Sequence, residues 1–293
     1  MFKFYFYKFY GLGIKSLVEF PELTQVDTNP DVFIRFNDFK LSNKFLNEEY
    51  KNTSNIPFFS CNELIFRVID GKEILVNPRV AINKNFLRSL ILNQGMGTLL
   101  YQRNFLVLHG SSVKMNDKAV AFLGQCGDGK STIIATLNNE GYPIISDDVL
   151  AVKLYNDGIP LLLSSYPRIK LYTDVIDYLN KDYKNYEKIH PEFEKYNFKT
   201  NSIKLDSNPL DFIYILNKAD KNEIQLMSPQ EKLISLVKHT YHKSMFGSIE
   251  KTQNLKQCIN LSKKVVIKQL NVSHSFKEIE QLINVVEDDI FKK

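Results

Sequence analysis

The segment Gly124–Ser131 constrains the fold of this chain more than any other. Its sequence, GQCGDGKS, matches the pattern G-x-x-x-x-G-K-[ST] at every position. The apolar run Ala119–Leu123 precedes it, and a segment with helical periodicity follows it. In a strand, loop and helix of this kind, glycines let the backbone curl until its N–H groups and the positive end of the helix face a phosphate group. The pattern therefore predicts a phosphate-binding loop (P-loop) in an α/β fold.

The candidate nucleotide-binding residues lie in this loop and the start of the helix: Gly124, Gly127, Asp128, Gly129, Lys130, Ser131 and Thr132. We expect Lys130 to reach the β- and γ-phosphates and the Ser131 hydroxyl to ligate Mg²⁺. The expected cofactors are therefore ATP or GTP with Mg²⁺. Cys126 lies in the same loop, where we interpret it as a small filler. The alternative is redox control, because a thiolate near a helix N-terminus is activated.

Two adjacent carboxylates follow the loop at the end of the next predicted strand. Asp147 and Asp148 come directly after Ile144–Ser146, and burying such a pair is costly unless a cation or a reaction needs it. In P-loop kinases one such Asp holds metal while another accepts the hydroxyl proton. The alternative is an exposed turn. His109, at the end of another buried run, is either a core histidine or a member of the same site.

The elements around this unit predict two regions. Residues 1–84 contain short aromatic and β-branched runs, such as Glu63–Val68 and Glu73–Val76 on either side of an Asp-Gly turn, which predict a β-rich N-terminal region. Residues 85–293 are expected to form the P-loop domain. Within it, the order strand, loop, helix and strand up to Ser146 predicts a βαβ unit.

Other patterns predict helices and one mobile segment. The periodicity from Phe86 to Tyr101 indicates a helix that links the two regions, and capping boxes at Ser228 and Ser275 open two more helices. The segment Tyr183–Asn197, rich in Tyr, Lys and Glu, is expected to be a mobile surface segment.

Composition and patterning exclude several partners. Lys and Arg number 38 against 33 Asp and Glu, and no basic stripe with interleaved aromatic residues points to nucleic acid. No apolar stretch approaches the roughly 20 residues of a membrane span, so we expect no membrane partner.

The cysteines and histidines do not indicate a metal site. Cys61, Cys126 and Cys258 form no C-x-x-C pair or zinc spacing, which favours reduced thiols in the cytoplasm. His239 and His242 could share a helix face as metal ligands, but a solvated helix is the preferred interpretation because no third ligand follows.

Four segments in order resemble the catalytic domain of HPr kinase/phosphorylase and its kinase relatives: His109–Val113, Ala121–Thr132, Gly141–Asp148 and Tyr166–Leu171. The specific similarity covers about residues 106–171. It implies an α/β P-loop kinase fold related to phosphoenolpyruvate carboxykinase, use of ATP with Mg²⁺, and phosphorylation of a serine hydroxyl. A homo-oligomer is also expected.

The resemblance also implies roles for single residues. Asp147 would be the catalytic base, Asp148 a metal-side or orienting carboxylate, and His109 a supporting group beside them. Arg168 would stabilise the transferred phosphate, a role that suits a planar, permanently charged donor.

One segment of the bifunctional enzymes is missing. The Glu-Ile-Arg-Gly-type segment that follows their Asp pair is not found here, so we expect neither phosphorylase action nor HPr as the acceptor. The chain looks more like single-activity relatives, a branch of which phosphorylates ribosomally made peptides, including the terminal serine of lasso-peptide precursors. The expected function is an ATP-dependent serine kinase of a peptide or protein. A catalytically silent nucleotide-binding module and a kinase of a small hydroxylated metabolite are the alternatives.

Overall fold

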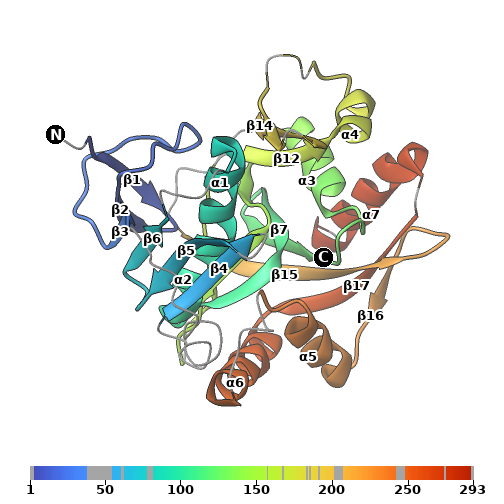
Figure 1. Ribbon diagram of the computed structural model, residues 1–293. Coiled ribbons are helices and arrows are strands. Elements are labelled where there is room, and N and C mark those ends of the chain that lie inside the picture. Colours follow the sequence, from blue (N-terminus) through green and yellow to red (C-terminus); the bar gives the residue numbers. More distant parts are fainter. Residues whose placement is uncertain are drawn as a thin grey trace.

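The computed structural model describes the following residues: 3–37, 55–60, 63–77, 82–156, 158–166, 168–182, 184, 186–190, 192–200, 207–241, 248–273 and 275–291. Within these ranges the chain forms a six-stranded, an eight-stranded and a three-stranded sheet, with helices between them (Figure 1). The expected α/β class and the β-rich N-terminal region are confirmed.

The eight-stranded sheet carries the P-loop. Its strands are β7 (Leu106–Met115), β8 (Lys118–Leu123), β9 (Ile144–Ser146), β10 (Val149–Lys153), β11 (Leu161–Leu163), β15 (Ser207–Lys218), β16 (Glu223–Leu226) and β17 (Val266–Val272). The order is β11-β10-β7-β8-β15-β17-β16, and β9 pairs with β7. Ser112 of β7 pairs with Ala121 of β8 and with Ser146 of β9, so β8 and β9 lie on opposite edges of β7.

Strand direction brings several strand ends to one edge of this sheet. β8 and β9 are both antiparallel to β7 and hence parallel to each other, and β15 and β17 run parallel to β8. The carboxyl ends of β8, β9, β15 and β17 therefore share one edge. The βαβ unit is confirmed with a correction, because β7 lies between its two strands. The sequence pattern does not reveal this insertion, since β7 precedes the unit in the chain.

Apolar residues cover both faces of the sheet. Val120 and Phe122 of β8 belong to one core cluster and Ala119, Ala121 and Leu123 to the other, as expected for a strand buried on both sides. The helices α3 (Lys130–Asn139) and α7 (Ile279–Phe291) pack on the first face, and α5 (Pro229–Lys238) and α6 (Ser248–Lys264) on the second (Figure 1).

The N-terminal sheet has its own core. Its strands are β1 (Tyr5–Phe9), β2 (Leu12–Ser16), β3 (Val32–Phe36), β4 (Asn55–Ser60), β5 (Glu63–Ile69) and β6 (Glu73–Val76). The predicted hairpin is confirmed: β5 and β6 pair across Asp70 and Gly71, both with positive φ. The predicted linking helix is also confirmed, as α1 (Lys84–Leu90), the π-helical turn η3 (Ile91–Gly95) and α2 (Met96–Gln102). These helices pack in the N-terminal core cluster, and a domain boundary at residues 84/85 stays a prediction.

A small third sheet corrects one expectation. It contains β12 (Arg168–Tyr172), β13 (Lys188–His190) and β14 (Phe193–Lys199), and α4 (Thr173–Tyr178) follows β12. The described part of Tyr183–Asn197 is thus largely paired, not a mobile surface segment. On β14, Tyr196 and Phe198 alternate with polar residues and are only 8% and 3% exposed. The expectation of mobility was based on the lack of aliphatic residues, but these aromatic side chains bury apolar surface in their place. Tyr183, Asn185 and Pro191 lie outside the described residues.

The two predicted capping boxes differ. Ser228 and Glu231 form the full reciprocal box at the start of α5, as predicted. At Ser275 the hydroxyl instead accepts from the amide of Lys277, and a 3₁₀ turn, η5 (Phe276–Glu278), precedes α7. Of the helices in the described ranges, none combines the length and the apolar character needed to cross a membrane.

Candidate active site

Glycines shape the P-loop between β8 and α3. Gly127 and Gly129 have φ of 86° and 91°, in the left-handed region that side chains with a Cβ disfavour. Gly124 is restricted by space, since a Cβ there would lie 3.1 Å from the Asp128 side chain and from Leu216 Cβ. Gly124 and Gly129, the two positions that the motif reserves for glycine, therefore each have a physical reason, and Gly127 adds a second residue with positive φ.

Lys130 opens helix α3 and its side chain turns back over the loop. Its Nζ donates to the carbonyl oxygens of Gly124, at 2.8 Å, and Gln125, at 2.7 Å. Burial lowers the pKa of Lys130, and the nearby charge of Asp128, which acts to raise that pKa, offsets only part of this effect. Ser131 and Thr132 follow in the first helical turn. The predicted loop residues are thus gathered at one helix N-terminus, where an anion is stabilised.

The turn between β9 and β10 carries both carboxylates. Asp148 has φ of 67°, a conformation that costs energy in a residue other than glycine and that surrounding contacts must hold. Ser146 Oγ donates to the carbonyl oxygen of Val149 at 2.6 Å, and Tyr10 Oη donates to the same oxygen at 2.8 Å. The exposed-turn alternative is wrong, because Asp147 is 7% exposed.

Asp147 is held by two donors. Ser111 Oγ donates to Oδ1 at 2.7 Å and the backbone amide of Lys170 to Oδ2 at 3.3 Å. Burial and the neighbouring charge of Asp148 raise the pKa of the Asp147 carboxyl above its usual value. A carboxylate with a raised pKa is a better proton acceptor near neutral pH.

The pKa of Asp148 is shifted in the opposite direction, below its usual value. Burial favours the neutral acid, but the charges of Lys170 and Lys195 outweigh burial and hold the pKa of Asp148 well below its usual range. Lys170 Nζ makes an ion pair with Oδ2 at 2.6 Å. Asp148 therefore stays ionised beside a partner whose pKa is raised, a split that is typical of sites with an acid-base task.

His109 joins the same cluster through the backbone. Its Nδ1 lies 3.1 Å from the carbonyl oxygen of Asp148, which can only accept, so the neutral ring donates from Nδ1 and leaves Nε2 as an acceptor. Burial and the charge of Lys130 lower the pKa of His109, which keeps the ring neutral. The next residue, Gly110, packs closely against β8, since a Cβ there would lie 2.5 Å from Leu123 Cδ2 and 2.7 Å from the Phe122 carbonyl oxygen.

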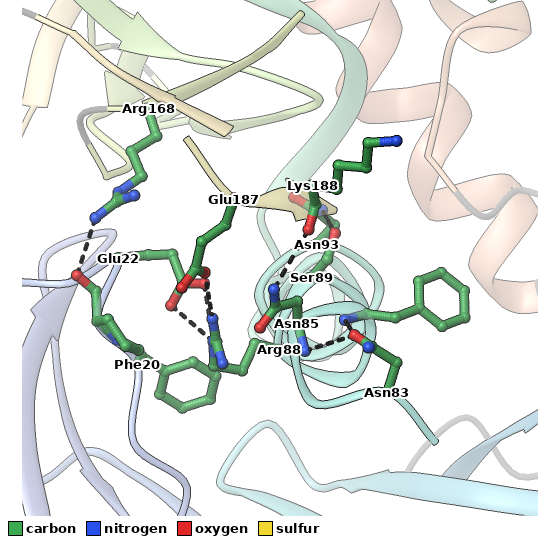
Figure 2. Close-up of polar contacts among 12 residues, drawn as sticks. Phe20, Glu22, Asn83, Asn85, Arg88, Ser89, Asn93, Arg168, Glu187 and Lys188 are labelled. Carbon is green, nitrogen blue, oxygen red and sulfur yellow. Dashed lines mark hydrogen bonds and ion pairs between the residues drawn. The ribbon is translucent and has the colours of Figure 1, made fainter. Parts of the chain in front are cut away.

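Arg168 is not brought to the carboxylates. Its Nη2 donates to the carbonyl oxygen of Pro21 at 3.0 Å, and Figure 2 shows it reaching toward the segment that carries Phe20 and Glu22. Its role toward a transferred phosphate stays a prediction. Lys170, two residues further along β12, is the cation that contacts the Asp pair.

Sequence reasoning missed three contributors to the site: Ser111, Lys170 and Lys195. The first two lie in segments that the sequence analysis singled out, but nothing in a single sequence distinguishes a buried lysine from a solvated one. Lys195 lies on β14, in the segment expected to be mobile. Its position depends on the pairing of β14 with β12.

The donor set fits Mg²⁺ carried with a nucleotide. Among the described residues, no group of three or more His, Cys, Asp or Glu side chains gathers around a common point. Mg²⁺ commonly takes one or two carboxylates with waters and substrate phosphates, so Asp148 and the Ser131 hydroxyl are a sufficient protein contribution. Oδ1 of Asp148 has no hydrogen-bond partner in the part of the chain that the structure describes.

Two minor expectations are corrected. Cys126 is exposed, because the loop turns its side chain outward, so it is not a filler. His239 is 7% exposed and does not lie on a solvated helix face, because it ends α5 beneath β7, where its carbonyl oxygen accepts from the amide of His109. His242 lies outside the described residues.

Comparisons with known proteins give one distant similarity. No family model matches this chain, and no curated protein matches it significantly. Among solved structures, the HPr(Ser) kinase/phosphatase from Coxiella burnetii is similar with 14% sequence identity and a TM-score of 0.36, over 64% of this chain and 91% of that chain. This similarity is too distant to assign the chain to a family.

Proposed function

We propose that this protein is an ATP-dependent phosphotransferase with a hydroxyl acceptor. The observation that carries the proposal is that β8 and β9 end at one sheet edge, so the P-loop and the Asp147–Asp148 turn face the same space. A loop for phosphates beside two carboxylates with opposite pKa directions has the parts that phosphoryl transfer to a hydroxyl needs.

Each part of the site has one task in this proposal. Lys130 and the amides at the start of α3 hold the nucleotide phosphates. Asp147 accepts the proton of the attacking hydroxyl, while Asp148 and Ser131 hold Mg²⁺. When bound, Mg²⁺ neutralises charge on the phosphate oxygens. His109 supports the strained backbone of Asp148 through its Nδ1 hydrogen bond.

For the acceptor we propose a serine of a peptide or protein. The support is the resemblance of residues 106–171 to kinases that phosphorylate serine, with the phosphoenolpyruvate carboxykinase-related fold that it implies. A ribosomally made precursor peptide of the lasso type is the specific acceptor that the resemblance favours, because the segment typical of bifunctional enzymes is missing after Asp148.

The test is a transfer assay with radiolabelled ATP and Mg²⁺. The acceptors are HPr, precursor peptides encoded beside the gene, and the same peptides with the candidate serine replaced by alanine. We expect label on the serine peptide only, with a mass increase of one phosphate. Lys130→Ala should abolish transfer, and Lys256→Ala, an exposed lysine on α6, should not.

The possible outcomes separate the alternatives. Nucleotide binding without transfer to any acceptor or to water would indicate a silent binding module. Transfer to small hydroxylated compounds but not to peptides would keep the phosphotransferase and reject the peptide acceptor. Full activity of Lys130→Ala would remove the P-loop from the reaction.

A further inference from the structure

We propose that Lys195 recognises a carboxylate of the acceptor, placed next to the hydroxyl that receives the phosphate. This inference rests on the proposed function, because it names the chemical class of acceptor for the same site: a hydroxyl with an anionic neighbour. Two sources of the carboxylate fit, the C-terminus of a peptide and an acidic side chain, and the experiment separates them. Neither the sequence motifs nor the resemblance assigns a role to Lys195.

The pairing of β12 with β14 sorts their side chains onto two faces. Residues that pair in a ladder lie on the same face, and successive residues alternate between faces. Ile169 and Leu171 pair with Phe198 and Tyr196, and these four side chains lie in the core cluster that α3 shares. The opposite face, here called the basic face, has four cations and no carboxylate among the described side chains of these two strands: Arg168, Lys170, Tyr172, Lys195, Asn197 and Lys199.

The basic face reaches the carboxylate turn. Lys170 Nζ makes its ion pair with Asp148 at 2.6 Å. Lys170 pairs with Asn197, which is two residues from Lys195, so the two lysines are diagonal neighbours in the ladder. Diagonal neighbours lie about 7–8 Å apart, within reach of long side chains. Although burial has the largest effect on both carboxyls, the charge of Lys195 acts to lower the pKa of Asp147 and of Asp148, as this position requires.

The ammonium group of Lys195 is positioned without being neutralised. Its Nζ lies 4.9 Å from the centroid of the Tyr172 ring, the residue opposite it in the ladder. Such a cation–π contact attracts the cation but leaves its N–H donors available. Within the described part of the chain, Lys195 Nζ makes no hydrogen bond or ion pair. Lys195 is half-buried and Tyr172 is exposed, so a ligand can reach the ammonium group from solvent.

The anion that fits Lys195 belongs to the acceptor rather than to the nucleotide. In the proposed function the nucleotide phosphates already have Lys130, the amides at the start of α3 and Mg²⁺. The acceptor hydroxyl has to reach Asp147, so a group attached next to that hydroxyl lies close to the Asp pair as well. A carboxylate there would be repelled by Asp147 and Asp148, because like charges at short range repel. Lys195 supplies the positive charge that offsets this repulsion.

The test is the transfer assay with one precursor peptide prepared in four forms. Two forms end at the candidate serine, one with a free C-terminal carboxylate and one with a C-terminal amide. The other two continue by one residue, Asp or Asn, and end in an amide. We measure kcat/KM for each form with wild-type protein, Lys195→Met and Lys199→Met. Lys199 lies on the same strand and face, at the end that pairs with Arg168, and is the matched control.

We expect wild-type protein to prefer at least one carboxylate form over its matched neutral form by about tenfold, the scale of a hydrogen bond between charged groups. A preference within the serine-terminated pair identifies the C-terminus as the source, and one within the Asp and Asn pair identifies an acidic side chain. In Lys195→Met the preference should fall to within about twofold, and in Lys199→Met it should stay near tenfold. The preference is a ratio between two acceptors, so a general effect of the lost charge on the Asp pair cancels.

Two outcomes would overturn the inference and leave the proposed function standing. In the first, wild-type protein phosphorylates matched carboxylate and neutral peptides equally well. In the second, the preference survives in Lys195→Met while all four peptides are slowed by the same factor, because Lys195 would then act on the transferred phosphate or on the Asp pair. If wild-type protein transfers phosphate to none of the four peptides, the proposed peptide acceptor fails together with this inference.

Further variants keep the test decisive if Lys195→Met misfolds. Calorimetry with Mg-ATP shows whether the nucleotide site is intact, and Lys195→Gln replaces Lys195→Met if that binding is lost. Lys195→Arg keeps the positive charge and should retain most of the preference for the carboxylate form. A preference lost as completely in Lys195→Arg as in Lys195→Gln would overturn the inference, because a retained cation would then have no effect.

Discussion

Tyr10 Oη donates a 2.8 Å hydrogen bond to the carbonyl oxygen of Val149, and this contact joins the N-terminal sheet to the candidate active site. Tyr10 lies in the turn between β1 and β2 with φ of 52° and is 2% exposed. Val149 directly follows the strained Asp148. Burial raises the pKa of Tyr10, so its hydroxyl remains a donor. The N-terminal region therefore helps to hold the carboxylate turn.

Removing that hydroxyl should weaken the fold. Tyr10→Phe keeps the ring but leaves the Val149 carbonyl oxygen with Ser146 as its remaining side-chain donor. We expect a loss of about 1–2 kcal/mol in the free energy of unfolding, measured by urea denaturation. Tyr5→Phe is the control, since its hydroxyl bonds to Glu19 at an exposed site, and it should change stability by less than about 0.5 kcal/mol. Equal effects would contradict a special role for Tyr10.

The ion pair of Lys170 and Asp148 should matter more than a surface pair. Lys170→Met removes the cation that is ion-paired with Asp148 and leaves only the charge of Lys195 to favour its ionised form, so we expect about 2–3 kcal/mol of destabilisation. The value lies below that of a fully buried pair because the Asp148 side chain is 22% exposed. Lys118→Met breaks the ion pair with Asp211 on the surface and should cost less than about 1 kcal/mol. Thermal unfolding at pH 7 measures both, and a smaller effect of Lys170→Met would argue against the pairing.

Asp147 and Asp148 should respond differently to amide substitution. Asp147→Asn should bind Mg-ATP normally yet lose turnover by roughly 10²–10⁴-fold, the usual contribution of a positioned base. Asp148→Asn should instead recover part of its activity when Mg²⁺ is raised. Calorimetry with Mg-ATP and turnover at several Mg²⁺ concentrations distinguish the two. Rescue of Asp147→Asn by Mg²⁺ would exchange the two roles.

Burial of His239 should make stability depend on pH. Burial, together with the charges of Lys238, Lys130 and His109, lowers the pKa of His239 to about 4, although the charge of Asp128 acts in the opposite direction. In the unfolded chain the pKa of this histidine has the ordinary value of about 6.5. Between these values the unfolded state binds the proton and the folded state does not, so stability falls as pH drops from about 6.5 to about 4 and then levels off.

The variant that tests this effect is His239→Gln, which cannot take up a proton. Partial solvent screening limits the His239 contribution to about 1–2 kcal/mol over that pH range. When the pH is lowered from about 7.5 to about 4.5, we expect the unfolding free energy of the wild type to fall by about 1–2 kcal/mol more than that of His239→Gln. A constant difference across the range would show that His239 does not drive the dependence.

Local patterns determined the parts of this protein whose conformation depends on neighbouring residues in the chain. The P-loop could be predicted because its motif is a short run of neighbouring residues, in which Gly129 supplies the positive φ that the motif needs. The hairpin around Asp70 and Gly71 could be predicted for the same reason. The capping box at Ser228 could be predicted because both of its hydrogen bonds join residues only three positions apart. The Asp pair followed from its place after an apolar strand.

Tertiary structure alone decided how these parts meet. Lys170 reaches Asp148 because β12 packs beside the carboxylate turn, and Lys195 lends its charge because β14 pairs with β12. Tyr10 contacts Val149 across 139 positions of sequence. Such contacts depend on strand order, including the insertion of β7 between β8 and β9, and strand order is set by burial of both sheet faces over the whole chain rather than by any local pattern.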